Sequence, residues 1–407
     1  MPFIRPFRAL RPAPSRAGEI IAPPYDVLSS AEARLRAQGK PWSFLHISKP
    51  EIDLDPGIDP YAPAVYAKAA ENLARAIAAG VLIRDSQPCY YVYRLTGKRG
   101  RQTGLAALTA PADGPNSGIL RHELTTPVKE DDRTRQIEAV NAQTGPVMMA
   151  YPSAPALDAL LASIAAHTTE VDAVADDGVR HELWTVADAS AIADFTRAAA
   201  ALPALYIADG HHRAAAAARV SAARSGRETR GLLAVLFPHH EMTILDYNRA
   251  VRDLGGRSIE QFLTAVAERF TLTGSSGAVR PTAATEFGMY LSGRWYKLRL
   301  GSDRVPHDHV IGRLPVALLD RHLIEPILGI TDPRLDKRIE FVGGGRGLAE
   351  LETRVKSGEM AVAFALFPTQ MSDLMAVADA GKIMPPKSTW FEPKLADGLL
   401  SHVLDEP

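Results

Sequence analysis

The chain has 407 residues, a length that predicts two or three domains or one elaborate α/β domain. With 46% hydrophobic and 23% charged residues, its composition excludes an intrinsically disordered chain. The formal net charge of -1 counts against a protein that coats nucleic acid, because such a surface needs a strong excess of lysine and arginine.

The features that the sequence lacks lead to expectations about the cellular compartment and the partners of the protein. The single cysteine, Cys89, rules out a disulfide within the chain. The N-terminal residues do not form the unbroken apolar stretch of a signal peptide, and no segment approaches the length of a membrane span. We therefore expect a cytoplasmic protein with neither a membrane nor a nucleic-acid partner, and a homo-oligomer stays open.

The first third of the chain predicts two helices and a hairpin. Residues 1–60 are rich in proline, but Ser29 lies three residues before Glu32, the spacing of a helix capping box. Apolar residues then recur at helical spacing over 66–77. The segment 89–110 reads as two strands with glycines at the turn between them.

The remaining chain alternates between helix and strand patterns. We predict a hairpin over 169–186, a helix over 189–202, a strand over 204–209, a helix after residue 213, strands over 231–238 and 242–251, a helix over 258–270, a hairpin over 286–300, helices near 315–328, 347–357 and 370–381, and a strand over 360–368. This pattern is typical of an α+β protein with mixed sheets. We expect three regions, 1–150, 151–255 and 256–407.

The predicted strand that ends at residue 209 feeds directly into a helix, and five polar or small residues occupy this corner. They are Asp209, Gly210, His211, His212 and Arg213. The first amides of a helix have no partner within the helix, and its dipole adds positive charge there, so phosphate binds readily. A glycine permits close approach of the backbone, and an arginine adds a planar fork for phosphate oxygens. We expect Arg213 to supply charge rather than packing.

The acidic and imidazole groups of the corner have several interpretations. Asp209 could orient a histidine, hold a hydroxyl or hold a metal ion, and the histidines could donate hydrogen bonds or transfer protons. Alternatively, Asp209 is a helix cap, the glycine a turn residue and the histidines partly exposed side chains. Because adjacent histidines diverge on a helix, we do not expect His211 and His212 to hold a metal together.

A resemblance to a known family rests on several segments in the same order. They are "IAPPYDVLS", "SFLHISKPE", "HELT…DDRTRQIEAVNAQTGPVMMAYP", "YIADGHHRAAAA", "FPHHEMTILDYNRAV", "LLDRHLIEPILGI" and "MPPKSTWFEPKLADGLL". Through them the chain resembles the domain of unknown function 1015 family from about residue 4 to about residue 405. This resemblance implies little about activity.

The corner itself, "DGHHR", is similar to the "DGHTR" corner of the free-serine kinases. These kinases belong to the sulfiredoxin and partition-protein (ParB-like) nucleotide-binding superfamily, which uses such a corner for phosphate. The resemblance implies a central phosphate-binding unit of ParB/sulfiredoxin-like type within residues 151–255. It also implies ATP or ADP with Mg²⁺. His212 stands where those kinases have threonine, which leaves the substrate in doubt.

A second polar constellation precedes a predicted helix. His122 and Glu123 lie in a loop, and Asp132 and Arg133 follow. Transfer of a phosphoryl group to an alcohol needs a carboxylate that accepts the hydroxyl proton, and Glu123 is our candidate. Asp132 is a candidate metal or substrate contact, or else it caps a helix that begins near Arg133. No residue is assigned with certainty to a metal.

Two stiff, proline-containing segments supply further candidates. Asp26 follows two prolines and is either a site residue or a turn residue. Lys387, Ser388 and Thr389 follow Pro385-Pro386 and are followed by two aromatic residues, which suits the wall of a phosphate pocket. Alternatively, this segment is a packed turn, and the lysine points into solvent. We expect Lys387 to share the pocket of the 209–213 corner.

These features lead to one functional hypothesis and two alternatives. We expect nucleotide-dependent phosphoryl transfer to a small hydroxylated metabolite, with free L-serine as the best single candidate, so the partners are a nucleotide and a small-molecule substrate. The first alternative is a nucleotide-binding switch without catalysis. The second is a hydrolase of phosphate esters or nucleotides.

Overall fold

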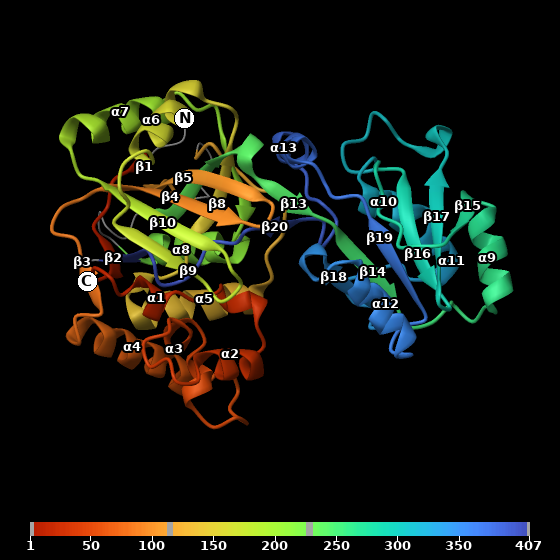
Figure 1. The fold of residues 1–407 in the computed structure, drawn as a ribbon, viewed down its shortest axis with the longest axis horizontal. Helices are drawn as coiled ribbons and strands as arrows, with labels where there is room; N and C mark the ends of the chain where they lie inside the picture. Colours follow the sequence, from red (N-terminus) through yellow and green to blue (C-terminus); the bar gives the residue numbers. More distant parts are fainter. Residues whose placement is uncertain (1–3, 112–116, 225–230, 405–407) are drawn as a thin grey trace. The chain divides into compact units, whose positions relative to one another are not determined.

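The computed structural model describes residues 4–111, 117–224 and 231–404. The chain forms two compact units, coloured by sequence in Figure 1. The first unit comprises Met1–Met242 and Pro393–Pro407, and the second comprises Thr243–Glu392. This division differs from the three regions we expected, because strands from the first two of those regions share one sheet and the C-terminal segment returns to the first unit.

A nine-stranded mixed sheet forms the centre of the first unit. Its order is β6-β11-β8-β12-β5-β4-β10-β9, and β1 also pairs with β5. The strands are β1 (Ile4–Arg5), β4 (Tyr90–Gly97), β5 (Gly100–Thr109), β6 (Ile119–Leu120), β8 (Val147–Tyr151), β9 (Val171–Val174), β10 (Arg180–Val186), β11 (Leu205–Asp209) and β12 (Leu232–Pro238). Both hairpins predicted here are confirmed, since β4 pairs with β5 and β9 with β10.

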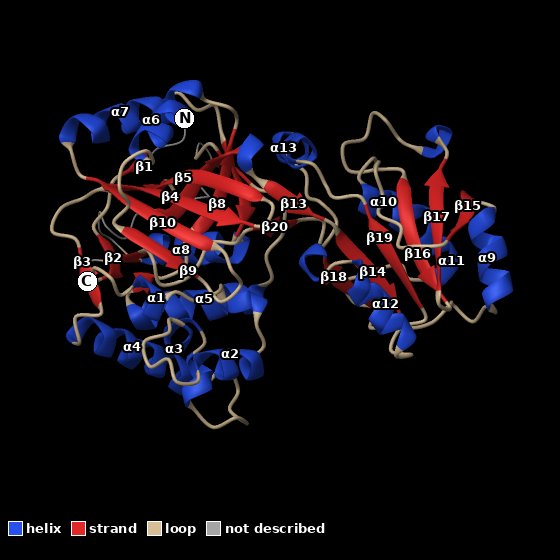
Figure 2. Cartoon of the chain, in the orientation of Figure 1, coloured by secondary structure: helices blue, strands red, loops and turns tan. Residues whose placement is uncertain are grey.

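Helices cover both faces of this sheet, and Figure 2 shows α6 and α7 on one side. The helices are α1 (Ala17–Ile20), α2 (Ser30–Ala37), α3 (Leu45–Ser48), α4 (Pro63–Ala78), α5 (Pro127–Val140), α6 (Pro155–Ile164), α7 (Ala189–Ala200) and α8 (His211–Ala223). The predicted capping box is confirmed at the start of α2, where Ser29 and Glu32 bond reciprocally. Burial of consecutive residues 90–93 of β4 shows that both faces of the sheet are packed.

A smaller sheet in the first unit ties the two ends of the chain together. Its order is β3-β2-β21-β7, with β2 (Ala9–Pro12), β3 (Leu82–Arg84), β7 (Ala142–Gln143) and β21 (Ser401–Val403). The C-terminal strand β21 pairs antiparallel with β2 and with β7. The segment after residue 392 is therefore anchored in the first unit, and the side chains just before β21 lie within it.

The second unit contains a six-stranded sheet of order β15-β17-β16-β19-β14-β18 and the pair β13-β20. Its strands are β13 (Thr243–Leu245), β14 (Tyr247–Val251), β15 (Phe270–Ser275), β16 (Glu286–Leu291), β17 (Arg294–Leu300), β18 (Ile339–Gly343), β19 (Val362–Leu366) and β20 (Trp390–Glu392), and its helices are α9 (Ile259–Ala267), α10 (Pro315–Leu319), α11 (Glu325–Leu328), α12 (Leu348–Lys356) and α13 (Met371–Asp379). The strand predicted over 242–251 is divided at Asp246, because β13 and β14 pair in different sheets.

The α+β class with mixed sheets is confirmed by this arrangement. The predicted strand-turn-helix unit is also present, as β11 followed by Gly210 and α8. Within 4–111, 117–224 and 231–404, none of the helices has the length and apolar character that a bilayer crossing requires.

Candidate functional site

The corner at residues 209–213 joins the end of β11 to the first turn of α8. Gly210 caps the helix with φ 98°, a left-handed conformation that residues with a side chain rarely adopt. A Cβ atom at Gly210 would lie 3.0 Å from the Arg213 guanidinium. The arginine therefore folds back over the glycine, and the sequence places its charge against the helix N-terminus.

Arg213 is buried in the protein rather than held at its surface, with an exposed fraction of 9%. One guanidinium nitrogen donates to the Pro146 carbonyl at 2.5 Å, and another lies 3.4 Å from the Asp209 carboxylate. Arg213 is therefore packed within the protein, contrary to our expectation, and the role of its charge toward phosphate stays a prediction. A buried guanidinium needs such partners to offset the loss of its hydration, so this side chain also supports the fold.

Asp209 stands between two cations at the end of β11. Its carboxylate lies 3.4 Å from the Lys394 ammonium, which comes from the C-terminal segment, and at the same distance from Arg213. Burial alone would raise the pKa of this carboxyl, but Lys394 and Arg213 outweigh burial and lower the pKa to about 2. Asp209 is thus ionised at neutral pH, and its charge is already shared between two cations.

His122, Glu123 and His211 form a compact group, called here the histidine cluster. One potential ligand atom of each residue lies within 4.8 Å of the others. The two rings meet edge to face, with centroids 4.6 Å apart. Burial lowers the pKa of His122 to about 4, against a hydrogen bond to the Ile207 backbone that favours the protonated ring. Burial, with the neighbouring His122, also holds the pKa of His211 well below its ordinary value.

Helix α5, which follows the loop of His122 and Glu123, begins earlier in the sequence than we expected. The helix begins at Pro127, where proline is favoured because the first amide needs no partner. Asp132 therefore lies inside α5, and the alternative that it caps a helix starting near Arg133 is wrong. At the same helix start, the Thr126 amide donates to the His212 ring at 3.2 Å, so His212 joins α8 to α5.

Asp132 and Arg133 lie beside each other at the wall of a cavity of about 230 Å³. The Asp132 carboxylate accepts from the Tyr66 hydroxyl at 2.9 Å and pairs with Arg133 at 2.7 Å. The Arg133 guanidinium also stacks over the Tyr25 ring, 3.9 Å from its centroid. Asp26 lines the same cavity. The structure thus brings together three candidates that the sequence placed in two separate motifs.

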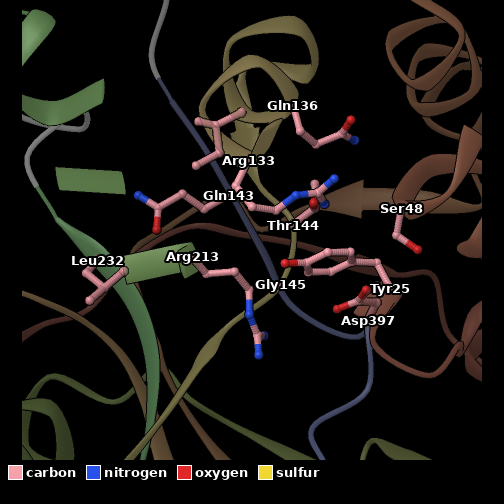
Figure 3. A pocket seen from close by; sticks show the side chains of 11 residues that line it. Tyr25, Ser48, Arg133, Gln136, Gln143, Thr144, Gly145, Arg213, Leu232 and Asp397 are labelled. Carbon is pink, nitrogen blue, oxygen red and sulfur yellow. The ribbon is translucent and has the colours of Figure 1, made fainter. Parts of the chain in front are cut away.

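A second, smaller cavity of about 30 Å³ joins this wall to the corner, and we call it the arginine cavity. Both Arg133 and Arg213 line it, together with Tyr25 and Asp397, and Figure 3 shows these side chains. The two cavities share Tyr25 and Arg133 in their linings. Polar groups from residues 25, 133, 213 and 397 thus meet in one region of the first unit.

Asp397 is the acidic group of the arginine cavity, and it is buried. Burial raises the pKa of its carboxyl to about 7, although Arg213 and Arg133 favour the charged form. Neighbouring Asp26 acts in the same direction as burial. Asp397 therefore titrates near neutral pH, beside two arginines.

Sequence reasoning missed three residues of this region: Tyr25, Lys394 and Asp397. Tyr25 directly precedes a candidate, and the other two lie in the motif "MPPKSTWFEPKLADGLL", of which only residues 387–389 were singled out. The charges of Lys394 and Asp397, which lie next to Pro393 and Gly398, are the signal that could have identified these two residues. Only the return of this segment to the first unit brings Lys394 to Asp209 at the end of β11.

The predicted phosphate contacts at Lys387, Ser388 and Thr389 belong to the second unit. Lys387 has φ 54°, and its ammonium lies 5.9 Å from the centre of the Tyr247 ring. The Ser388 hydroxyl donates to the Pro385 carbonyl at 2.6 Å. The segment is thus an ordered turn within its own unit, and the role of its side chains toward phosphate stays a prediction.

The chain belongs to the family described as protein of unknown function (DUF1015), whose model matches residues 4–321. The family resemblance that the sequence motifs indicated is thereby confirmed over residues 4–321, whereas we expected it to extend to about residue 405. The match includes the 209–213 corner, the histidine cluster and the residues of α5, whereas Lys394 and Asp397 lie beyond its end. No curated protein matches the chain.

Three solved structures to which the chain is similar show low sequence identity. A conserved hypothetical protein from Pyrococcus furiosus matches with a TM-score of 0.34 and 13% identity, over 70% of this chain and 91% of that one. A free serine kinase in complex with AMP matches with a TM-score of 0.35 and 12% identity, over 67% of this chain and 83% of that one. C-terminally truncated SbnI from Staphylococcus aureus matches with a TM-score of 0.36 and 14% identity, over 72% of this chain and 85% of that one.

Proposed function

We propose that this DUF1015 family member transfers a phosphoryl group from a nucleotide to a small hydroxylated metabolite, with free L-serine as the first acceptor to test. The observation that carries the proposal is the meeting of His122, Glu123 and His211 at the N-terminus of α8, beside Gly210. An acid-base group and a phosphate-binding helix terminus at one place are what phosphoryl transfer to an alcohol requires.

The phosphates of ATP or ADP bind, in this proposal, to the backbone at residues 210–213. The first amides of a helix have no partner within it and can bind an anion, and α8 begins directly after the left-handed Gly210, which lacks a side chain. Arg213 lies against this glycine and adds positive charge where charge develops in the reaction. Lys387, Ser388 and Thr389 remain further proposed phosphate contacts.

Glu123 is the proposed base that accepts the proton of the acceptor hydroxyl. Its side chain is half-buried beside two buried imidazoles. Asp209 suits this role less well, because two cations already stabilise its ionised form and lower its pKa. A carboxylate with such a low pKa is a weak base toward an alcohol.

The acceptor would occupy the cavity of about 230 Å³. Arg133 and Asp26 on its wall offer a cation and an anion to the carboxylate and ammonium of an amino acid. Arg133 is already oriented by Asp132 and by the Tyr25 ring. This pairing of opposite charges supports an amino acid such as serine over a neutral alcohol.

Magnesium, which the kinase resemblance implies, is expected to enter with the nucleotide. Mg²⁺ prefers oxygen ligands and keeps several waters, so it is usually held through phosphates and one or two carboxylates. The histidine cluster offers two nitrogens and a single carboxylate, and Asp209 is engaged by Lys394 and Arg213. When bound, the ion would neutralise phosphate charge.

The test is to incubate purified protein with Mg-ATP or Mg-ADP and L-serine, then a metabolite mixture, and to analyse the products by mass spectrometry. A phosphorylated acceptor that depends on both nucleotide and protein supports the proposal. Nucleotide breakdown without any acceptor would instead indicate a hydrolase. Nucleotide binding with no turnover under any condition would favour a switch.

A further inference from the structure

We propose that His122, Glu123 and His211 form a binding site for a divalent transition metal of the zinc class, distinct from the magnesium that accompanies a nucleotide. The proposal does not rest on phosphoryl transfer, because the site is complete without a nucleotide or an acceptor. Two imidazoles and one carboxylate are a ligand set that zinc accepts, and three protein ligands leave a position open for a water or a substrate oxygen.

The geometry of the cluster fits such an ion after a small adjustment. Ligand atoms at the usual distances from zinc lie about 3.4 Å apart in a tetrahedral site. The three candidate atoms lie within 4.8 Å of one another. The two rings meet edge to face at 86° rather than stacking in parallel, so a rotation of one ring is needed for both to offer a nitrogen to one ion. Side-chain rotations that move each atom by about 1 Å would complete the site.

The hydrogen bonding of the two rings gives independent support. His211 is only 6% exposed, and its buried Nε2 atom has no hydrogen-bond partner among the residues that the structure describes. Buried polar atoms normally have a partner, and a metal ion would supply one. The His122 ring hydrogen-bonds to the backbone of Ile207. A bond of this kind fixes the orientation of a metal-binding imidazole and leaves its other nitrogen for the ion.

The charges around the cluster indicate when the ion would bind most tightly. Metal ligation uses the lone pair of an uncharged imidazole nitrogen, and both rings are buried. The N-terminus of α8 carries partial positive charge, which disfavours an isolated cation, and Glu123 offsets this only in part. An anion bound at the open coordination position of the metal would offset the remaining positive charge. We therefore expect phosphate and metal to strengthen each other's binding.

The first experiment measures metal binding by the full chain, purified without a histidine tag and stripped with a chelator. Calorimetry with Zn²⁺, Mn²⁺ and Mg²⁺ should give about one tight site for Zn²⁺, weaker binding of Mn²⁺ and no binding of Mg²⁺ alone. Co²⁺ should give visible absorption bands of a low-symmetry site. Addition of inorganic phosphate should tighten Zn²⁺ binding.

Variants connect this binding to the three residues. His211→Ala and His122→Ala should each weaken Zn²⁺ binding by more than the roughly 10- to 100-fold that loss of an outer-sphere partner costs. His167 is exposed and serves as the matched control, so His167→Ala should bind as the unaltered protein does. His211→Gln keeps a polar side chain in case the alanine variant does not fold.

Two results would overturn the proposal. One is the absence of a Zn²⁺ or Co²⁺ signal with folded, unaltered protein. The other is equal affinity in His167→Ala and in folded His211→Gln. Neither result bears on phosphoryl transfer, which is measured separately by product formation. Conversely, a protein that binds Zn²⁺ at these residues but forms no phosphorylated product would retain the metal site and lose the proposed function.

Discussion

The imidazole of His122 meets that of His211 edge to face, at a centroid distance of 4.6 Å and an interplanar angle of 86°. One ring comes from the loop before α5 and the other from the first residue of α8. Both are buried, so two adjacent positive charges there would be costly. The contact therefore requires neutral rings, and this requirement makes the first unit sensitive to acid.

We expect the first unit to lose stability as the pH falls from about 6.5 to about 4. The pKa of His122 is about 4 in the folded chain and 6.5 ordinarily, so the unfolded chain binds more protons within this window. Stability then rises with pH across it, by at most about 1.4 kcal/mol per pH unit for this histidine. Denaturant titrations, read in the first unit by pulsed hydrogen exchange, measure the slope.

His122→Asn should reduce the slope of this pH dependence, because asparagine does not titrate in the window and only other groups such as His211 still contribute. The exposed His167 again provides the control, since His167→Ala should leave the slope unchanged. An unchanged slope in folded His122→Asn would show that the acid sensitivity arises elsewhere.

Glu123→Gln should lower turnover by about 100-fold or more, the usual effect of removing a general base, while nucleotide affinity stays within a few-fold. Zn²⁺ binding by the same variant separates the two roles proposed for this residue. Because Glu123 is also a proposed Zn²⁺ ligand, Zn²⁺ affinity should fall together with turnover, and retained Zn²⁺ affinity would leave Glu123 as the base alone.

The control for this prediction is Glu138→Gln, an exposed position on α5. It should affect neither turnover nor Zn²⁺ binding. Full turnover in Glu123→Gln would exclude the carboxylate as the base and would leave Asp209 as the next residue to examine.

The parts of the molecule that the sequence predicts well are those that depend on neighbouring residues. The capping box at Ser29, the turn at Gly210 and the two hairpins of the large sheet each follow from short segments, and each is present. Short motifs also indicated the candidates Asp26, Asp132 and Arg133, which line a common cavity, and their role in a site stays a prediction.

What the sequence did not predict depends on how distant segments meet. Lys394 reaches Asp209 only because β21 pairs with β2 and draws the C-terminus into the first unit. Burial of Arg213 likewise depends on the carbonyl of Pro146 and on the surrounding core. No periodicity or turn signal encodes these long-range contacts, so neither the division into two units nor the arginine cavity could be predicted.

Gly210→Ala should destabilise the first unit more than Gly178→Ala does. Both glycines have positive φ, 98° and 82°, so alanine brings a similar backbone strain of about 1–2 kcal/mol at each. Of the two, only Gly210 would bring the new Cβ to 3.0 Å from a guanidinium, whereas no atom of the described residues lies within 4 Å of a Cβ at Gly178. The guanidinium cannot move freely, because Pro146 and Asp209 hold it.

Gly210→Ala should also weaken ADP binding, measured by calorimetry, while Gly178→Ala binds normally. Valine at position 210 should be worse in both respects because its branched side chain fits the left-handed conformation poorly. Equal stability and equal ADP affinity in the two alanine variants would contradict both the close contact and the phosphate site at this corner.

Asp397→Asn should change the pH dependence of stability in the opposite direction from His122→Asn. Burial raises the pKa of Asp397 to about 7, from 3.8 ordinarily, so the folded chain binds more protons than the unfolded chain between about pH 4 and 7. Asp397 therefore lowers stability as the pH rises through that window, by at most about 1.4 kcal/mol per pH unit. Asparagine keeps the shape and cannot ionise, so it removes this loss.

The stability of Asp397→Asn relative to the unaltered protein should therefore be higher at pH 8 than at pH 5. The same denaturant titrations at the two pH values measure the gain, and Asp303→Asn, at an exposed position, is the control. If the stability difference between Asp397→Asn and the unaltered protein is the same at both pH values, Asp397 is ionised throughout, and the two arginines outweigh its burial.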